Sequence, residues 1–318
     1  MKPKPKDLSA AQEDVTLRVD PGNDGLRLDK FIRSKLPWRS RASVQRAIAT
    51  GRVLVDGTPG RVNRRVHPGQ EVRVVVPPPP EGMIRHHEIE IDVLYEDRWL
   101  LAINKQPGII VHPVGKHLYN TVINVLHHRY RRPGDPENDV VPNLIHRIDK
   151  DTSGLLLVAK DETVRAAMAM QFERKEVRKE YLALVAGEVE RDAGVIDRPL
   201  AKDPRSNMKT KMAVVEGGLS SSTAYSVEER FSGFTLLRLA PRTGRTHQIR
   251  VHCASIGHPL LSDSLYGGGA GDGVIDRHAL HAERATFSHP KSGAATTIAA
   301  PLAPDFVRAI ETLRRRRS

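Results

Sequence analysis

The chain has 318 residues and a formal net charge of +12, from 50 Lys and Arg against 38 Asp and Glu. This length predicts two domains. The charge favours a polyanionic partner, foremost nucleic acid, because clustered cationic side chains release counterions from phosphates. A merely basic soluble protein is the alternative. A membrane or secreted protein is disfavoured and a cytoplasmic location expected, because no run approaches the roughly 18 apolar residues of a membrane span and the single cysteine, Cys253, excludes an internal disulfide.

The N-terminal part of the sequence predicts a tail followed by a small α/β unit. Residues 1–24 carry Lys, Pro, Asp and Gly with little apolar periodicity, which is typical of a flexible basic tail. In residues 25–76, apolar spacing and turn residues predict helices at Leu28–Lys35 and 40–50 and strands at Val53–Val55 and 71–76. Four consecutive prolines follow, so residues 77–87 are predicted to form a linker.

Positive charge is concentrated in this first part of the chain. Residues 1–80 hold 16 Lys and Arg against 8 acidic residues, a net charge of +8. We therefore predict a phosphate-binding face around the second helix and the strand and loop beside it. Its candidate side chains are Arg39, Arg41, Arg46, Arg64 and Arg65. An ordinary solvated helix surface is the alternative.

From residue 88 the chain alternates short strands with short helices. Strands are predicted at 91–95, 99–103, 155–158, 181–185 and 235–239, and a helix capped by Asp161 is predicted to follow the third of them. The short strands and irregular connections favour an α+β fold over a parallel βαβ array. This second domain is expected to span residues 88–312. A run of arginines then predicts a solvated basic tail at 313–318, with unspecific affinity for RNA as the second interpretation.

The most informative segment is the polar stretch His-Arg-Ile-Asp-Lys-Asp-Thr-Ser-Gly at residues 146–154, which leads directly into an apolar strand. A loop braced by a strand holds a carboxylate in fixed geometry, and the adjacent Arg147 favours its charged form. Asp149 is therefore a candidate nucleophile or base. The alternative is an ordinary turn in which Asp149 and Thr152 cap backbone amides.

This stretch nearly reproduces the His-Arg-Leu-Asp-x-x-Thr-Ser-Gly signature of RluA-type pseudouridine synthases. The first unit resembles the S4 RNA-binding module, and together the two resemblances span roughly residues 26–76 and 88–290. They imply a pseudouridine-synthase fold around a mixed, largely antiparallel central sheet, plus a small α/β S4-like domain that docks structured RNA. Supporting segments in the expected order are 27–31, 43–51, 53–57 and 68–72 for the S4-like unit, and 104–105, 111–113, 179–187, 244–252, 257–261 and 265–267 for the synthase.

The resemblance implies a chemistry that needs no cofactor. Pseudouridylation detaches uracil at N1, rotates it and rejoins it through C5, so it requires one ionised carboxylate, a cation to orient it and a surface for the base. Asp149 matches the essential carboxylate and Arg250 the arginine expected to pair with it, with a structural ion pair as the alternative for Arg250. Tyr181 matches the tyrosine whose ring lies under the target base, with a core tyrosine as the alternative.

Three further arginines are candidate RNA contacts. Arg147 is similar to the family's arginine that fills the gap left by the flipped nucleotide, although a plain phosphate contact would use the same residue. Arg242 and Arg245 flank a turn at Gly244, just before a helix predicted to start near Thr246. Free backbone amides and the helix dipole favour phosphate there, with surface solvation as the alternative.

The sequence departs from the family pattern at three places. Ile148 replaces the usual leucine, which conserves volume. Gln106 follows Lys105 where proline is common, so that loop is expected to differ in shape. Ser262 stands where glycine is usual, and its turn is expected to differ if the glycine requires positive φ.

Other signals point away from cofactors. The 14 histidines lack the spacing of a zinc site, and the glycines at 267–273 lack the Lys and Ser/Thr of a nucleotide-binding loop, so neither a metal nor a nucleotide cofactor is expected. We expect a monomer whose partner is RNA, foremost large-subunit ribosomal RNA. The alternatives are a synthase acting on tRNA or another RNA, a non-catalytic RNA-binding or ribosome-assembly factor, and a glycoside hydrolase using Asp149 with Asp151.

Overall fold

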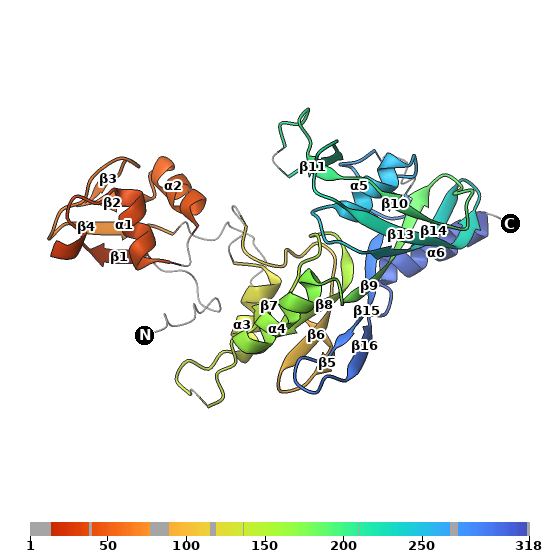
Figure 1. Ribbon diagram of the computed structural model, residues 1–318, viewed down its shortest axis with the longest axis horizontal. Coiled ribbons are helices and arrows are strands. Elements are labelled where there is room, and N and C mark those ends of the chain that lie inside the picture. The colour runs from red at the N-terminus through yellow and green to blue at the C-terminus, as the bar shows by residue number, and fades with distance from the viewer. Residues whose placement is uncertain are drawn as a thin grey trace. The chain divides into compact units, whose positions relative to one another are not determined.

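The computed structural model describes residues 14–37, 40–76, 89–114, 119–135, 137–208, 210–267 and 273–316 (Figure 1). These residues fall into two compact units, 14–76 and 89–316. Residue Arg39, one of the predicted phosphate contacts, lies outside the described residues. No helix among the described residues is long and apolar enough to cross a membrane.

The first unit packs two helices on a small antiparallel sheet with strand order β1-β4-β2-β3. Phe31 and Ile32 of the first helix and Val44 and Ile48 of the second are buried in one core with Val53, as their helical spacing predicts. Ser40 caps the second helix by accepting a hydrogen bond from the amide of Ser43 at 3.2 Å. The elements are β1 Val15–Arg18, η1 Pro21–Asn23, α1 Leu28–Lys35, α2 Arg41–Ala49, β2 Val53–Val55, β3 Thr58–Pro59 and β4 Glu71–Val74.

The tail predicted at residues 1–24 is wrong for its last part. Residues Val15–Arg18 form β1, which pairs antiparallel with β4. Val15 and Leu17 alternate with Thr16 and Arg18 and pack against the core of the first unit. This alternation covers only four residues, so the surrounding Lys, Pro and Gly dominate the sequence pattern and favour the prediction of a tail.

The second unit is built on a ten-stranded sheet, counted over the described residues, whose main order is β10-β13-β14-β9-β15-β8-β6-β5 (Figure 1). Its ladders are antiparallel except the parallel pairing of β15 with β8, so the mixed, largely antiparallel α+β architecture is confirmed. The elements are β5 Asp92–Glu96, β6 Leu100–Lys105, α3 Val122–Tyr130, β7 Asn143–Leu144, β8 Ser153–Ala159, α4 Glu162–Glu173, β9 Arg178–Ala186, β10 Ala193–Asp197, β11 Leu200–Lys202, β12 Met212–Val214, β13 Ser222–Phe231, β14 Phe234–Pro241, α5 Gln248–Ser255, β15 Leu280–Ser288, β16 Ala295–Ala299 and α6 Pro304–Arg316.

Helices cover both faces of the sheet around β8, which is why this strand is apolar without alternation. Leu155 and Leu157 lie in the core that includes Val164 of α4, whereas Leu156 lies in the core that includes Leu126 of α3. Successive side chains of a strand point to opposite faces, so a strand buried on both faces reads as a continuous apolar run. The segment that follows the Asp149 loop is therefore fixed from both sides.

The basic tail predicted at residues 313–318 is wrong for residues 313–316, because these end helix α6. Phe306, Ile310 and Leu313 recur at helical spacing and are buried in one core. Arg314 pairs with Glu229 of β13 at 2.8 Å. The run of arginines is typical of a tail, but the segment belongs to an amphipathic helix whose apolar face packs on the sheet.

Candidate active site

The site lies where β8, β15 and β9 run side by side in the sheet. Gly154 allows the close approach of β8 to β15, because a Cβ on this residue would lie within 3 Å of three backbone atoms of Ala282. Its φ of +105° is also a conformation that side chains with a Cβ rarely adopt. The glycine of the signature motif thus positions the loop just before it against its neighbouring strand.

The loop that carries Asp149 is tied down from two directions. Lys105, at the end of β6, is buried and donates a hydrogen bond to the carbonyl of Lys150 at 2.8 Å. Arg277 donates to the carbonyl of Asp151 at 2.9 Å. Burial lowers the pKa of Lys105 to about 7, and the backbone carbonyls of Gln106 and Ile109 complete its hydrogen bonds. The Lys105 and Arg277 side chains hold the loop through its backbone and leave the carboxylate of Asp149 to other partners.

Arg250, from α5, joins two carboxylates. Its Nη1 donates to Oδ2 of Asp149 at 3.1 Å, and its Nε and Nη2 grip Asp263 at 2.7 and 2.8 Å. Burial opposes the charge of Arg250, but hydrogen bonding and attraction from Asp263 and Asp149 outweigh it and raise its pKa. Asp263 is 1% exposed, and its bidentate pairing fixes the orientation of the guanidinium. The remaining nitrogen, Nη1, then faces Asp149.

His247 precedes α5 and lies beside the same carboxylate. Its backbone adopts a left-handed conformation with φ of +55°. Its Nε2 is 3.9 Å from Oδ2 of Asp149, and its Nδ1 is 2.8 Å from the hydroxyl of Tyr266. Burial is the largest influence on His247 and lowers its pKa.

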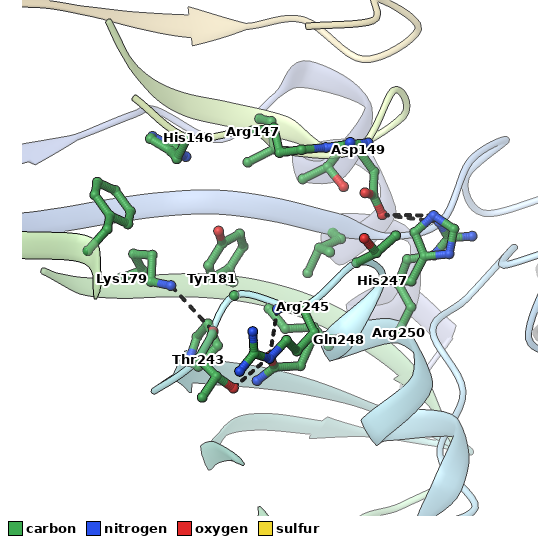
Figure 2. A pocket seen from close by; sticks show the side chains of 18 residues that line it. His146, Arg147, Asp149, Lys179, Tyr181, Thr243, Arg245, His247, Gln248 and Arg250 are labelled. Atoms are coloured by element: carbon green, nitrogen blue, oxygen red, sulfur yellow. Dashed lines mark hydrogen bonds and ion pairs between the residues drawn. The ribbon is translucent and has the colours of Figure 1, made fainter. Parts of the chain in front are cut away.

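Tyr181 projects from β9 into the same pocket (Figure 2). Burial and the nearby charge of Asp149 both raise its pKa, so the ring remains a neutral phenol at physiological pH. Its hydroxyl has no hydrogen-bond partner within the part of the chain that the structure describes. A neutral ring beside a carboxylate provides an apolar face without competing for the negative charge.

These side chains surround a pocket of about 250 Å³ (Figure 2). This volume is close to the ~300 Å³ at which pockets for drug-sized ligands begin, and a single base with its sugar is of this scale. Its far end is cationic: burial lowers the pKa of Lys179 to about 8, and its Nζ lies 3.4 Å from the carbonyl of Thr243. Lining residues include His146, Arg147, Asp149, Phe172, Lys179, Tyr181, Thr243, Gly244, Arg245, His247, Gln248 and Arg250.

The pocket contains five of the predicted residues. Asp149, Arg250, Tyr181, Arg147 and Arg245 all line it, whereas Arg242 is not among its lining residues. The others belong to the first unit, where Arg41 lies 3.9 Å from Asp29, Arg64 donates to Thr58, Arg65 donates to the carbonyl of Gly25, and Arg46 is exposed.

The turn before α5 differs from the prediction in one respect. The helix begins at Gln248, and the side chain of this residue accepts hydrogen bonds from the amide of Arg245 at 3.0 Å and the hydroxyl of Thr243 at 2.7 Å. The amide of Arg245 is therefore not free to bind phosphate. Because the protein itself satisfies this donor, a phosphate at this turn is left with the other amides and the side chains.

The signature motifs do not single out Asp263, His247 or Lys179 as parts of the site. Asp263 is preceded by Ser262, which adopts the positive φ of +54° that the family's glycine permits, so the turn is kept despite the substitution. The hydroxyl of Ser262 donates to the carbonyl of Ile275. The pairing of Asp263 with Arg250 depends on this turn, which brings a buried carboxylate back toward α5.

The histidines that invite a metal interpretation have other partners. His278 and His281 are buried and hydrogen-bond to Thr152 and Ser153, each at 2.9 Å. His252 bonds to Thr223 at 2.9 Å. In the described ranges, no three His, Cys, Asp or Glu side chains come together in a way that would hold a metal ion. These histidines instead brace the strands and the loop around the pocket.

Comparisons with known proteins agree with the fold. The RNA pseudouridylate synthase family matches residues 99–255, and the S4 domain family matches residues 26–72. The chain is 37% identical over 306 residues to the Bacillus subtilis protein "Uncharacterized RNA pseudouridine synthase YlyB", covering 96% of this chain and 99% of that protein. It is 36% identical over 325 residues to "Ribosomal large subunit pseudouridine synthase D" of Nitrosomonas europaea, covering 98% and 92% of the two chains.

A solved structure shares the fold of the second unit. Human RNA Pseudouridylate Synthase Domain Containing 1 superimposes with a TM-score of 0.56 at 25% sequence identity, covering 71% of this chain and 95% of that one. The near full-length similarity to the bacterial relatives adds the S4 domain, which lies in the first unit. The chain therefore belongs to the RNA pseudouridine synthase family and is an RNA-modifying isomerase with an S4 domain.

Proposed function

We propose that this chain converts uridines of large-subunit ribosomal RNA to pseudouridine, with Asp149 as the essential carboxylate. The observation that carries the proposal is the carboxylate of Asp149 held at 3.1 Å by a buried arginine, at the edge of a pocket of about 250 Å³. The ribosomal substrate is supported by the relatives named ribosomal large subunit pseudouridine synthase D, which cover nearly the whole chain.

The reaction breaks the bond between N1 of uracil and C1′ of ribose and forms a bond between C5 and C1′. The proton leaves C5 and N1 regains one, so no atoms are gained or lost and no redox partner is needed. Asp149 either adds to C1′ or removes the proton at C2′, and both routes require an ionised carboxylate in a fixed direction. Arg250 donates to this carboxylate at 3.1 Å and so sets its direction.

The other lining residues have complementary roles in the proposal. Tyr181 supplies the flat face on which the uracil rests while it is detached and rotated. Arg147 is exposed on the loop and fills the gap that the flipped nucleotide leaves in the RNA. Arg245 and Arg242 contact phosphates next to the target, through their side chains.

The first unit docks the RNA. We propose that residues 25–76 act as the RNA-binding domain, and residues 88–312 with the end of α6 as the catalytic domain. Arginines at the surface of the first unit supply affinity through phosphate contacts, whereas the pocket supplies the chemistry. The enzyme is proposed to work in the cytoplasm as a monomer, without metal or nucleotide cofactor. The contacting residues are proposed to be Arg39, Arg41, Arg46, Arg64 and Arg65.

The test replaces Asp149 with asparagine, which keeps the size of the side chain and removes its charge. Cells lacking the gene are complemented with the wild type, Asp149→Asn or Asp151→Asn, and pseudouridines are mapped in total RNA. Asp151 is a matched control because it lies on the same loop but does not line the pocket. We expect specific sites in large-subunit ribosomal RNA to lose pseudouridine with Asp149→Asn and to keep it with Asp151→Asn. Modification by Asp149→Asn at the wild-type level would remove the proposed role of this loop.

A further inference from the structure

The two oxygens of Asp149 have different surroundings. Oδ2 lies 3.1 Å from Nη1 of Arg250 and 3.9 Å from Nε2 of His247 (Figure 2). Oδ1 has no hydrogen-bond partner among the residues that the structure describes. One oxygen thus faces two nitrogen groups, and the other is left for a ligand in the pocket.

The proton of His247 can be located from its neighbours. The hydroxyl oxygen of Tyr266 accepts a hydrogen bond from the amide of Met212 at 3.0 Å, because a backbone amide can only donate. The hydroxyl oxygen could accept a second hydrogen bond, but its own hydrogen needs an acceptor, and among the described residues that acceptor is Nδ1 of His247, 2.8 Å away; we therefore assign the hydroxyl hydrogen to this contact. A neutral imidazole has one acceptor and one donor nitrogen, so an accepting Nδ1 leaves the hydrogen on Nε2. That is the nitrogen nearest Asp149.

His247 is surrounded by charges of both signs. Burial is the largest influence and lowers its pKa; Asp149 and Asp263 act in the opposite direction, and Arg250 and Arg147 act with burial. The ring is therefore neutral at and above neutral pH, as the arrangement with Tyr266 requires. A neutral donor beside the carboxylate orients it without adding a further positive charge.

The position of the ring is fixed by the backbone and by Tyr266. His247 is in the left-handed conformation immediately before α5, with φ of +55°. The ring of Tyr266 meets the imidazole edge-on at 5.7 Å and also lies 5.2 Å from the guanidinium carbon of Arg250. Tyr266 thus contacts both groups that face Oδ2, and Met212 of β12 holds its hydroxyl in place.

We propose that His247 is a positioning residue for Asp149: its Nε2–H donates to Oδ2 together with Arg250 and so presents Oδ1 to the ribose. This inference rests on the proposed role of Asp149. The present distance of 3.9 Å is longer than a hydrogen bond, and such contacts commonly shorten when substrate closes the site. Tyr266 acts one step further out, by selecting the tautomer of His247.

The decisive comparison is between His247→Gln and His247→Asn. The amide nitrogen of glutamine can reach the position of Nε2, whereas that of asparagine reaches only the position of Nδ1. Asparagine tolerates the left-handed backbone better than glutamine, so the stability of the fold should rank asparagine equal to or above glutamine. Activity should rank in the opposite order if donation to Asp149 matters.

Steady-state kinetics on ribosomal RNA fragments give the first readout. Because a hydrogen bond to a charged group is at stake, we expect His247→Asn to lower kcat by about 10- to 100-fold and to leave KM within about threefold. His247→Gln should keep kcat within about tenfold of the wild type and above that of His247→Asn. Equal rates for the two variants, or a faster His247→Asn, would overturn the proposal.

The second readout is the tautomer of His247, that is, which ring nitrogen carries the hydrogen. A histidine with a merely structural role would not require the hydrogen on Nε2. Ring nitrogen resonances of ¹⁵N-histidine-labelled protein, assigned by their loss in His247→Gln, should show hydrogen on Nε2 in the wild type. Tyr266→Phe keeps the ring beside Arg250 but removes the hydroxyl, so it should shift this resonance toward the other tautomer and lower kcat. Hydrogen on Nδ1 in the wild type would contradict the inference. An active Asp149→Asn enzyme would instead contradict the proposed function, so the two failures are distinguishable.

Discussion

Arg41, Arg46 and Arg65 of the first unit and Arg250 of the second represent two opposite uses of arginine in this chain. In the first unit, Arg46 and Arg65 are exposed, and Arg41 is 63% exposed and 3.9 Å from its nearest carboxylate. In the second unit, the side chain of Arg250 is 9% exposed and makes charge-assisted hydrogen bonds to two aspartates. Exposed cations supply salt-dependent affinity for phosphates, whereas a buried arginine that is hydrogen-bonded to carboxylates fixes the direction of those carboxylates.

In the proposed function, this contrast separates RNA binding from chemistry. A charge removed from an exposed surface weakens attraction to RNA and leaves the fold nearly unchanged. A charge removed from the pocket leaves a buried partner unpaired, and the structure loses stability as well as function.

The largest effect is expected for Arg250→Ala. It leaves Asp263 buried at 1% exposure without its bidentate partner, and loss of one member of a buried pair costs about 3–5 kcal/mol of unfolding free energy. Turnover should fall by at least about 100-fold, because the carboxylate of Asp149 loses both orientation and charge pairing. Urea unfolding and single-turnover assays measure the two losses.

The control for Arg250→Ala is the double variant Arg250→Ala with Asp263→Asn. It removes the buried negative charge as well, so we expect much of the stability to return while turnover stays low. If stability and turnover recovered together, the low activity of the single variant would reflect poor folding, and the proposed orientation of Asp149 by Arg250 would be wrong.

The next effect concerns Lys179 and pH. Burial lowers its pKa to about 8, so the ammonium is mostly charged at pH 7 and becomes neutral as pH rises through that value. If Lys179 meets an RNA phosphate at its end of the pocket, affinity should be complete near pH 7 and should fall above pH 8, by about 10-fold or more on losing a charge-assisted bond. Affinity measured from pH 6.5 to 9 tests this step.

Lys179→Arg controls for titration of the RNA and of other groups. Its guanidinium stays charged throughout this range, so the step above pH 8 should disappear while any remaining pH dependence is kept. A step of the same size in both proteins would show that a group other than Lys179 is responsible.

The arginines at the surface of the first unit should have smaller, separate effects. Each change of Arg41, Arg46, Arg64 or Arg65 to Gln that removes a phosphate contact should weaken RNA binding by roughly fivefold at 0.15 M salt. The slope of log affinity against log salt should become shallower by about 0.7–0.9 per lost contact. Turnover of bound RNA should not change. A variant that lowers single-turnover rate at saturating enzyme would break the division between the two units.

The fold could be predicted from the sequence where the pattern is local. Helix α4 lies where Asp161 and the apolar spacing predict it, with the Asp161 side chain accepting from the amide of Val164 at 2.9 Å. Strand Val53–Val55 has the predicted bounds. By contrast, β15 enters the sheet between β9 and β8 although about a hundred residues separate it from either strand. Such pairings depend on long-range contacts that local periodicity does not contain.

The same distinction holds for the site. The motifs predict Asp149 and Arg250, which lie 101 residues apart in the chain and meet at 3.1 Å. Asp263 and His247 could not be assigned in this way, because their roles depend on a turn at Ser262 and a left-handed backbone at the start of α5. Tertiary packing determines which buried residues support a site, and a sequence motif does not contain that information. The reactive groups themselves lie in recognisable motifs.

The smallest effect is expected for Arg314→Ala, at the end of α6. Arg314 pairs with Glu229 at 2.8 Å as Arg250 pairs with Asp263, yet its side chain is 58% exposed and that of Glu229 is 26% exposed. Water solvates both charges when the pair is broken, so the unfolding free energy should fall by only about 0.2–1 kcal/mol, and by less at 1 M salt. Arg315→Ala is the matched control, since this neighbouring side chain is exposed and has no ion-pair partner among the described residues. Urea unfolding at low and high salt measures the difference between the two variants. A loss for Arg314→Ala as large as that for Arg250→Ala would mean that burial does not decide what an arginine contributes in this protein, and the comparison between its two classes of arginine would fail.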